Sequence, residues 1–100
     1  MRFNAIIIDQ NDNVVTVLKD ISVGERVAFI KNGKIQNIVV KENIPFGHKV
    51  AIKNIRKGEL IIKYGYPIGI ATRDIKTGEH VHIHNLMSVR GSIRKPGFSP

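Results

Sequence analysis

Three of the four histidines in this chain lie at alternate positions, His80, His82 and His84. In an extended strand, alternate side chains share one face and lie about 7 Å apart at Cα. Imidazoles at that spacing can hold a metal ion, and an imidazole near neutral pH can move a proton. A solvated polar strand face gives the same pattern. The run alone therefore leaves a metal site, acid–base chemistry and a plain surface open, and it selects no particular metal.

The fourth histidine stands out because of a local unit that recurs four times, at residues 20–27, 43–50, 54–61 and 74–81. Each unit has Asp or Asn, then Ile, two variable residues, Gly, usually Glu, one variable residue and an aliphatic. We expect each to be a strand end followed by a tight turn. The Asp or Asn would bond its own downstream backbone, the Ile would enter the core, and the Gly would take a positive φ.

The second unit has His48 where the other three have Glu, and Lys49 follows it. One interpretation is that His48 is an ordinary exposed polar residue. The other is that this turn is adapted to present an imidazole and an ammonium group side by side. The stretch Lys63–Gly69 is also unusual, since two glycines and a proline predict a bend or bulge. It is either a corner between strands or a place where Lys63 and Tyr64 meet a ligand.

These side chains must be positioned by strands, because Ile and Val occur in short runs between Gly, Pro, Asn and Asp. The Asn32-Gly33 pair predicts a hairpin, and no long segment has a helical apolar period. We expect an all-β fold, a small barrel-like or clip-like domain of short strands. In the last strand, Val81 and Ile83 would anchor the core. The predicted strands are Phe3–Ile8, Val14–Leu18, Val27–Ile30, Ile35–Val40, Val50–Ile55, Leu60–Tyr64, Ile68–Thr72 and His80–Leu86.

Composition narrows the class of protein. The chain has no Cys, which excludes disulfides and thiolate metal sites, and its N-terminal apolar run is too short for a signal peptide or a membrane span. We therefore expect a cytoplasmic, soluble protein. The net charge of +8 fits an acidic protein surface, a carboxylate substrate or nucleic acid. The few aromatics and the lack of a groove-reading motif count against nucleic acid.

The motifs of a complete enzyme are missing. There is no phosphate-binding loop, nucleophile elbow, Cys nucleophile or distinctive pair of carboxylates. A chain of 100 residues is expected to form one domain. We therefore expect it to contribute one edge of an active site rather than the whole site.

Four segments together resemble a known family. Residues 12–16, 44–51, 62–69 and 78–85 are similar to the N-terminal SAF-type domain of altronate and galactarate dehydratases, a module that also occurs as the small subunit of sulfolactate sulfo-lyase. The resemblance runs from about residue 4 to residue 87. It implies a SAF-type β-clip domain over residues 1–87, followed by a basic C-terminal tail over residues 88–100.

The resemblance also implies a function. Such lyases remove water or sulfite from a sugar acid or hydroxy acid by abstracting a proton next to a carboxylate. The dehydratases depend on a divalent metal, typically iron, and most of their catalytic residues lie in a larger second domain. For this chain we expect a large partner subunit in its place. The chain alone would be inactive, and self-association stays open. The resemblance implies six site residues: His48, Lys49, Tyr64, His82, His84 and Asn85. The roles are our own expectation: His48, His82 and His84 catalytic, Lys49, Tyr64 and Asn85 substrate-binding. As an alternative role, we expect His82 and His84, with His80 as a third candidate, to be metal ligands.

Two other functions remain open at this point. The domain could be a binding module for sugar acids or glycans without a part in catalysis. The positive charge also leaves a nucleic-acid binder in consideration, which steep salt dependence of binding would reveal.

Overall fold

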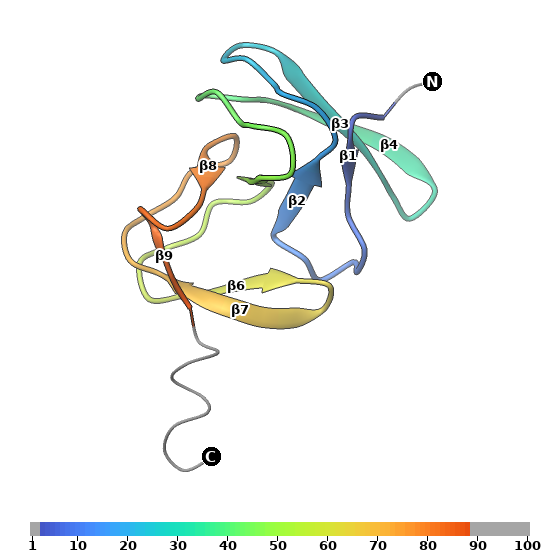
Figure 1. Cartoon of the computed structure of the whole chain (residues 1–100). Helices are drawn as coiled ribbons and strands as arrows, with labels where there is room; N and C mark the ends of the chain where they lie inside the picture. Colours follow the sequence, from blue (N-terminus) through green and yellow to red (C-terminus); the bar gives the residue numbers. More distant parts are fainter. Residues whose placement is uncertain (1–2, 89–100) are drawn as a thin grey trace.

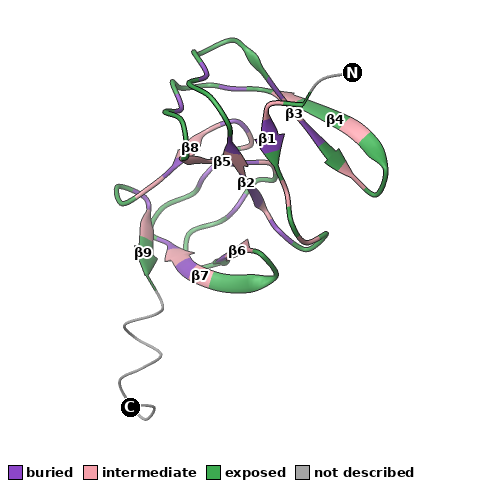
Figure 2. Cartoon of the chain, turned by 45° about the vertical axis from the view of Figure 1, so that its right-hand side comes forward, coloured by how far each residue is buried: buried purple, intermediate pink, exposed green. Residues whose placement is uncertain are grey.

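A four-stranded antiparallel sheet forms the centre of the fold, with its strands in the order β1-β2-β5-β8. Figure 1 shows the whole chain, and Figure 2 labels all four of these strands. The computed structural model describes residues 3–88. The strands of the central sheet are Ala5–Ile6 (β1), Val14–Val17 (β2), Lys49–Ala51 (β5) and His80–Val81 (β8). The sheet thus brings together segments that are far apart in the sequence.

A hairpin of Arg26–Lys31 (β3) and Lys34–Val39 (β4) lies beside β1. Its two turn residues are Asn32 and Gly33, with φ angles of 53° and 76°. Positive φ at both positions is what a two-residue hairpin turn of this type requires, and Asn-Gly is its preferred pair. The predicted hairpin is therefore confirmed.

The third sheet contains Leu60–Lys63 (β6), Tyr66–Ala71 (β7) and Leu86–Ser88 (β9) in that order. Along β6, Ile61 pairs with Gly69 but Ile62 pairs with Pro67, so β7 carries one extra residue. This irregularity confirms the bulge predicted for Lys63–Gly69. Within residues 3–88 there is no helix, and hence none long and apolar enough to cross a membrane. The predicted all-β fold class is confirmed.

The central sheet separates two small apolar cores, because successive side chains of a strand point to opposite faces. Val15, Val17 and Val50 face the core shared with Val27 and Phe29 of β3. On the other face, the core residues are Val14, Ala51, Ile55, Ile61, Ala71, Ile75 and Val81. Figure 2 shows buried segments along the strands of the central sheet and mostly exposed residues at the outer loops. Both cores thus meet at β2 and β5.

The four repeated units work in pairs. Asp20 Oδ1 accepts a hydrogen bond from the Phe46 N–H, and Asn43 Oδ1 accepts one from the Val23 N–H. Units three and four exchange the same bonds, from Lys57 N–H to Asp74 Oδ1 and from Thr77 N–H to Asn54 Oδ1. The prediction that each Asp or Asn bonds its own downstream backbone is therefore wrong. Each side chain bonds the turn of the partner unit instead.

The predicted burial of the isoleucine in each unit is confirmed. Ile21 pairs with Ile44 and Ile55 pairs with Ile75 through isolated β-bridges, and all four side chains lie in the two cores. The unit glycines also take the predicted positive φ, between 85° and 93°. The two units of each pair are thus joined by contacts between their buried isoleucines and by two hydrogen bonds from backbone N–H groups to side chains.

The predicted strand His80–Leu86 is wrong in its second half. The chain leaves β8 after Val81, turns through residues 82–85, and re-enters a sheet at Leu86. Val81 is buried as predicted, but Ile83 is 81% exposed and anchors no core. The strand β9 ends at Ser88, and residues 89–100 of the predicted basic tail lie outside the described residues.

A buried carboxylate ties the β6–β7 hairpin to the N-terminal loop. Asp12 is 1% exposed, and its Oδ1 accepts the Gly65 N–H at 2.8 Å. Its Oδ2 accepts the N–H groups of Asp9 and Ile8 at 3.1 and 3.3 Å. A carboxylate that satisfies buried backbone donors in this way is expensive to remove.

We expect Asp12→Ala to lower the free energy of unfolding by about 3 kcal/mol, since it leaves these N–H groups without an acceptor. The neighbouring Asn11 is exposed, and Asn11→Ala should change the same quantity by less than about 0.5 kcal/mol. Urea denaturation of the two variants and the wild type measures both. Equal losses for the two variants would contradict this role of Asp12.

Candidate functional site

Two neighbouring strands of the central sheet bring three histidines together. Strands β5 and β8 pair with Lys49 opposite Val81 and Val50 opposite His80. The Val17 N–H donates to the His48 carbonyl, so the chain continues extended before β5. Continuing the same register places His48 opposite His82. His48 and His80 therefore emerge on the sheet face that also carries Val50, and the His82 ring stacks on the His48 ring.

The three imidazoles form a compact group, which we call the three-histidine cluster. His48 Nδ1 lies 2.9 Å from His80 Nε2, a hydrogen-bond distance. The His48 ring stacks on the rings of His80 and His82 with centroid separations of 5.1 and 4.3 Å. One nitrogen from each ring can be chosen so that all three lie within 4.8 Å of one another. The cluster thus offers three converging nitrogen ligands.

The turn chemistry explains why position 48 is free to be a histidine. In the other units the Glu Oε1 accepts the N–H of the residue three positions earlier, namely Ser22, Arg56 and Lys76. In the second unit that residue is Pro45, which has no N–H to donate. A Glu at position 48 would lack its usual donor. The proline therefore releases the position for another side chain.

The turn after β8 places the His82 side chain beside His48 and His80, and Asn85 stabilises this turn. Asn85 is only 3% exposed. Its Oδ1 accepts the His82 N–H and its Nδ2 donates to the His80 carbonyl, each at 2.9 Å. The amide predicted to contact substrate is thus engaged with the backbone of two cluster residues. Its geometry is that of a positioning residue.

His84 lies beside the cluster rather than in it. Its ring is 5.4 Å from the His80 ring, and the side chain is exposed in the turn. The alternation that predicted His80, His82 and His84 on one strand face does not hold beyond Val81, because the strand ends there. The structure therefore groups His48 with His80 and His82 and leaves His84 outside this group. The assignment of His82 and His84 as metal ligands stays a prediction.

Lys49 and Tyr64 occupy other positions. Strand alternation sends Lys49 to the sheet face opposite His48. The turn therefore does not present the two groups side by side, as one of the two interpretations of this unit required. Partial burial and the nearby Lys63 charge lower the Lys49 pKa. Tyr64 lies in the β6–β7 turn with φ 58°, and Lys63 Nζ lies 4.8 Å from its ring centroid. Lys63 was not a predicted site residue, although its segment was singled out.

Two of the three cluster histidines, His80 and His82, have a lowered pKa, which favours the neutral imidazole. Burial, followed by the charges of His48, His84 and His82, lowers the pKa of His80 to about 4, and Glu42 opposes this shift. Glu42 also accepts the His80 backbone N–H at 2.7 Å. Burial and the charges of His48, Lys49 and His84 lower the pKa of His82. A neutral imidazole keeps the nitrogen lone pair that a metal ion needs.

These residues fit a divalent metal. A metal with nitrogen ligands at about 2.0–2.1 Å holds neighbouring nitrogens roughly 3.0–3.4 Å apart. The distance of 2.9 Å between His48 Nδ1 and His80 Nε2 is close to that spacing. All three ligand nitrogens lie within 4.8 Å of one another, so small movements of the rings would bring them to the spacing that a metal requires. The three histidines could therefore form a metal site, with further coordination positions left for a ligand.

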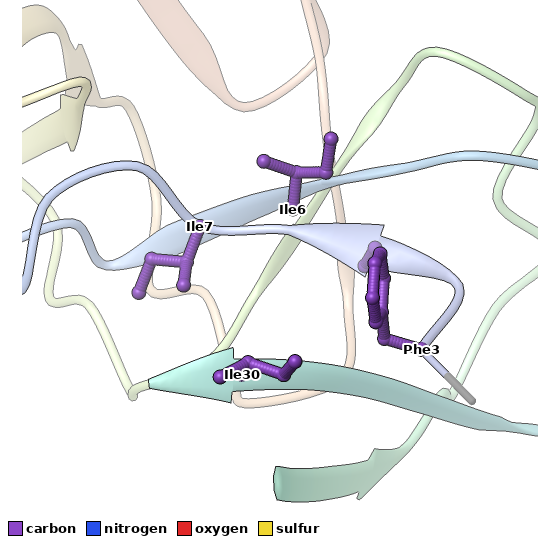
Figure 3. A pocket seen from close by; sticks show the side chains of 5 residues that line it. Phe3, Ile6, Ile7 and Ile30 are labelled. Atoms are coloured by element: carbon purple, nitrogen blue, oxygen red, sulfur yellow. The ribbon is translucent and has the colours of Figure 1, made fainter. Parts of the chain in front are cut away.

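A separate hollow lies between β1 and β3 and has a different character. Phe3, Ala5, Ile6, Ile7 and Ile30 line it (Figure 3). In the close-up the apolar side chains of Phe3, Ile7 and Ile30 surround an open space. No titratable side chain lines it, so this hollow supplies no chemistry of the kind found at the cluster.

The comparisons with known proteins agree on one kind of domain. Residues 3–89 match the family model of the altronate/galactarate dehydratase SAF domain. The chain is 40% identical over 93 residues to altronate dehydratase of Bacillus subtilis, covering 93% of this chain and 18% of that protein. It is 43% identical over 89 residues to altronate dehydratase of Escherichia coli, covering 89% and 17%. It thus spans less than a fifth of these relatives.

A third relative has nearly the same length. The chain is 33% identical over 93 residues to (2R)-sulfolactate sulfo-lyase subunit alpha of Chromohalobacter salexigens. This match covers 90% of this chain and 99% of that subunit. The same kind of domain is therefore found both within a longer enzyme and as a subunit of similar size to this chain.

The lowered pKa of His80 gives a pH test on the metal-free chain. The unfolded chain binds this proton below pH 6.5, whereas the folded chain binds it only near pH 4. The unfolded state is thus favoured by acid, and the free energy of unfolding should fall as pH falls from 6.5 to 4. Denaturation in the presence of a chelator across this range measures the slope. His80→Gln should flatten it, and His84→Gln should retain most of it, because burial is the main cause of the shift. Equal slopes in wild type and His80→Gln would contradict the assignment.

Proposed function

The chain belongs to the altronate/galactarate dehydratase SAF domain family, and we propose on that basis that it is the small component of a lyase that acts on a sugar acid or hydroxy acid. A larger domain or subunit would complete the active site. The observation that carries the proposal is the convergence of His48, His80 and His82 at one edge of the central sheet. The similar length of the sulfo-lyase alpha subunit supports a separate large partner.

The reaction sets requirements that this edge can meet. Elimination of water or sulfite begins with removal of a proton next to a carboxylate, and it needs both a base and stabilisation of the charge that develops on the carboxylate. The pKa values of His80 and His82 are lowered by burial, so both imidazoles are neutral at pH 7. The net charge of +8 attracts an anionic acid to the domain.

We assign the metal-binding role to the three-histidine cluster. His48, His80 and His82 would hold a divalent metal, for which we propose iron by resemblance to the dehydratases. A bound divalent metal supplies Lewis-acid stabilisation of negative charge on an oxygen. Asn85 fixes the turn that carries His82, and Glu42 holds the backbone of His80. Their role is to keep the ligand nitrogens in place.

The remaining predicted residues have distinct proposed roles. His84, which is exposed beside His80 and outside the cluster, would take or return a proton. Lys49 would attract an anionic group from the opposite side of the sheet edge. Tyr64 stays a proposed substrate contact through the Lys63–Tyr64 pair. Neither a pure binding module nor a nucleic-acid binder needs three imidazole nitrogens to converge, and so we place both below the lyase.

The proposal predicts that the chain alone has no lyase activity and that activity appears when it is combined with its large partner. The partner is identified by purification of the tagged chain from its native source. In the reconstituted enzyme, His82→Ala should lower metal affinity by more than about 10-fold and reduce kcat/KM accordingly. Gln36→Ala, an exposed change on β4, is the control and should change neither quantity. Full activity of His82→Ala would overturn the site assignment.

A further inference from the structure

Each of the two turns that carry the three-histidine cluster also exposes a large apolar side chain. Ile83, which directly follows His82, is 81% exposed, more than any other large apolar residue that the structure describes. Phe46, two residues before His48, is 65% exposed. The His48 and His82 rings stack with a centroid separation of 4.3 Å, so the two turns meet at the cluster. Apolar surface therefore adjoins the candidate site from both turns.

The fold does not require an apolar residue at position 46. In each repeated unit, the residue before the turn glycine donates its backbone N–H to the Asp or Asn of the partner unit. These donors are Val23, Phe46, Lys57 and Thr77. In the third and fourth units a polar residue thus fills the same position with the same hydrogen bond. Because the turn has no need of the Phe46 ring, burial against another molecule is what would stabilise it.

The turn that carries Ile83 is held in one conformation. The Asn85 amide makes two hydrogen bonds to its backbone, and Arg73 Nη2 donates a third to the His84 carbonyl at 3.2 Å. Ile83 itself belongs to neither apolar core. An apolar side chain on a backbone that is already fixed binds a partner at a low cost in conformational entropy.

The charges near these turns favour an acidic partner. Lys19 precedes Asp20, whose carboxylate accepts a backbone N–H of the second unit, and Arg73 bonds the turn after β8. Among residues 3–88, neither Lys19 nor Arg73 forms an ion pair with an Asp or Glu. The carboxylate of Glu42 accepts the backbone N–H of β8. With a net charge of +8, the chain is complementary to a surface that carries carboxylates.

We propose that Phe46 and Ile83 are the apolar anchors by which the chain docks onto the larger component that completes the lyase site. This inference rests on the proposed function and identifies the surface that the partner covers. The partner offers an apolar contact for each anchor, with acidic groups around them. The position of the cluster decides the occupant, because a component that supplies the rest of the site must cover the edge where the cluster lies. The docked partner would also exclude water from that edge.

The affinity of the chain for its large component tests this surface without measuring turnover. The component that co-purifies with the tagged chain is isolated, and calorimetry gives its Kd for the wild type and each variant. Phe46→Thr, which copies the fourth unit, and Ile83→Thr should each raise Kd at least about tenfold. Phe46→Lys, which copies the third unit, repeats the test with a second side chain. Added salt should weaken wild-type binding, and an affinity independent of salt would contradict the acidic partner surface.

Ile30→Thr is the matched control, because it makes the same change as Ile83→Thr at an exposed position on β3. β3 contacts β1, which lies at the edge of the central sheet opposite β8. This control should change Kd by less than about twofold. An amide NMR spectrum that is unchanged away from the substituted residue confirms that each variant is folded.

Unchanged affinity of both Phe46→Thr and Ile83→Thr, or equal weakening by Ile30→Thr, would overturn the docking surface and leave the lyase proposal standing. Self-association of the chain that the same two variants abolish would assign the surface to a second copy and would also overturn it. A complex that assembles through Phe46 and Ile83 but has no lyase activity would instead overturn the proposed function alone.

Discussion

Reciprocal hydrogen bonding between the turns organises this small domain. Asp20 and Asn43 each bond the backbone of the other's unit, and Asn54 and Asp74 do the same in the second pair. The second and fourth units lead directly into β5 and β8, which then pair with each other. With two small apolar cores, the fold depends on these bonds to fix where strands begin. Backbone bonds then fix the register of β5 against β8, since the Ala51 N–H donates to the Glu79 carbonyl and the Gly78 N–H to the Ala51 carbonyl. This register brings His48 to His80 and His82.

The three-histidine cluster lies where the pattern of hydrogen bonds within the turns differs from that of the other units. Three units use a Glu to accept a backbone N–H within their own turn, and the second has Pro45 at the donor position. The missing N–H removes the structural need for Glu and makes His48 compatible with the turn. Asn85 provides the second local departure, since its buried amide folds residues 82–85 back over β8. A polar cluster is thereby built from two turns rather than from one strand.

The sequence predicted the all-β class, the Asn32-Gly33 hairpin and the buried isoleucines, because these follow from local composition and turn chemistry. It placed His80 in a strand and singled out His48. The prediction was wrong for the placement of Ile83 and His84, because it continued the strand alternation beyond Val81. The chain turns there, and the Asn85 side chain stabilises that turn. The exchange of bonds between turn units is a tertiary feature that no single unit reveals.

The central claim is that His48, His80 and His82 act together as a set of metal ligands. X-ray absorption at the zinc edge, recorded on the full chain with one equivalent of Zn²⁺ as a probe, measures this coordination directly. The account predicts three imidazole nitrogens at about 2.0 Å from the zinc, with imidazole back-scattering lost from a His48→Ala variant. A zinc spectrum with only water or carboxylate oxygens, or one that is unchanged by His48→Ala, would contradict it.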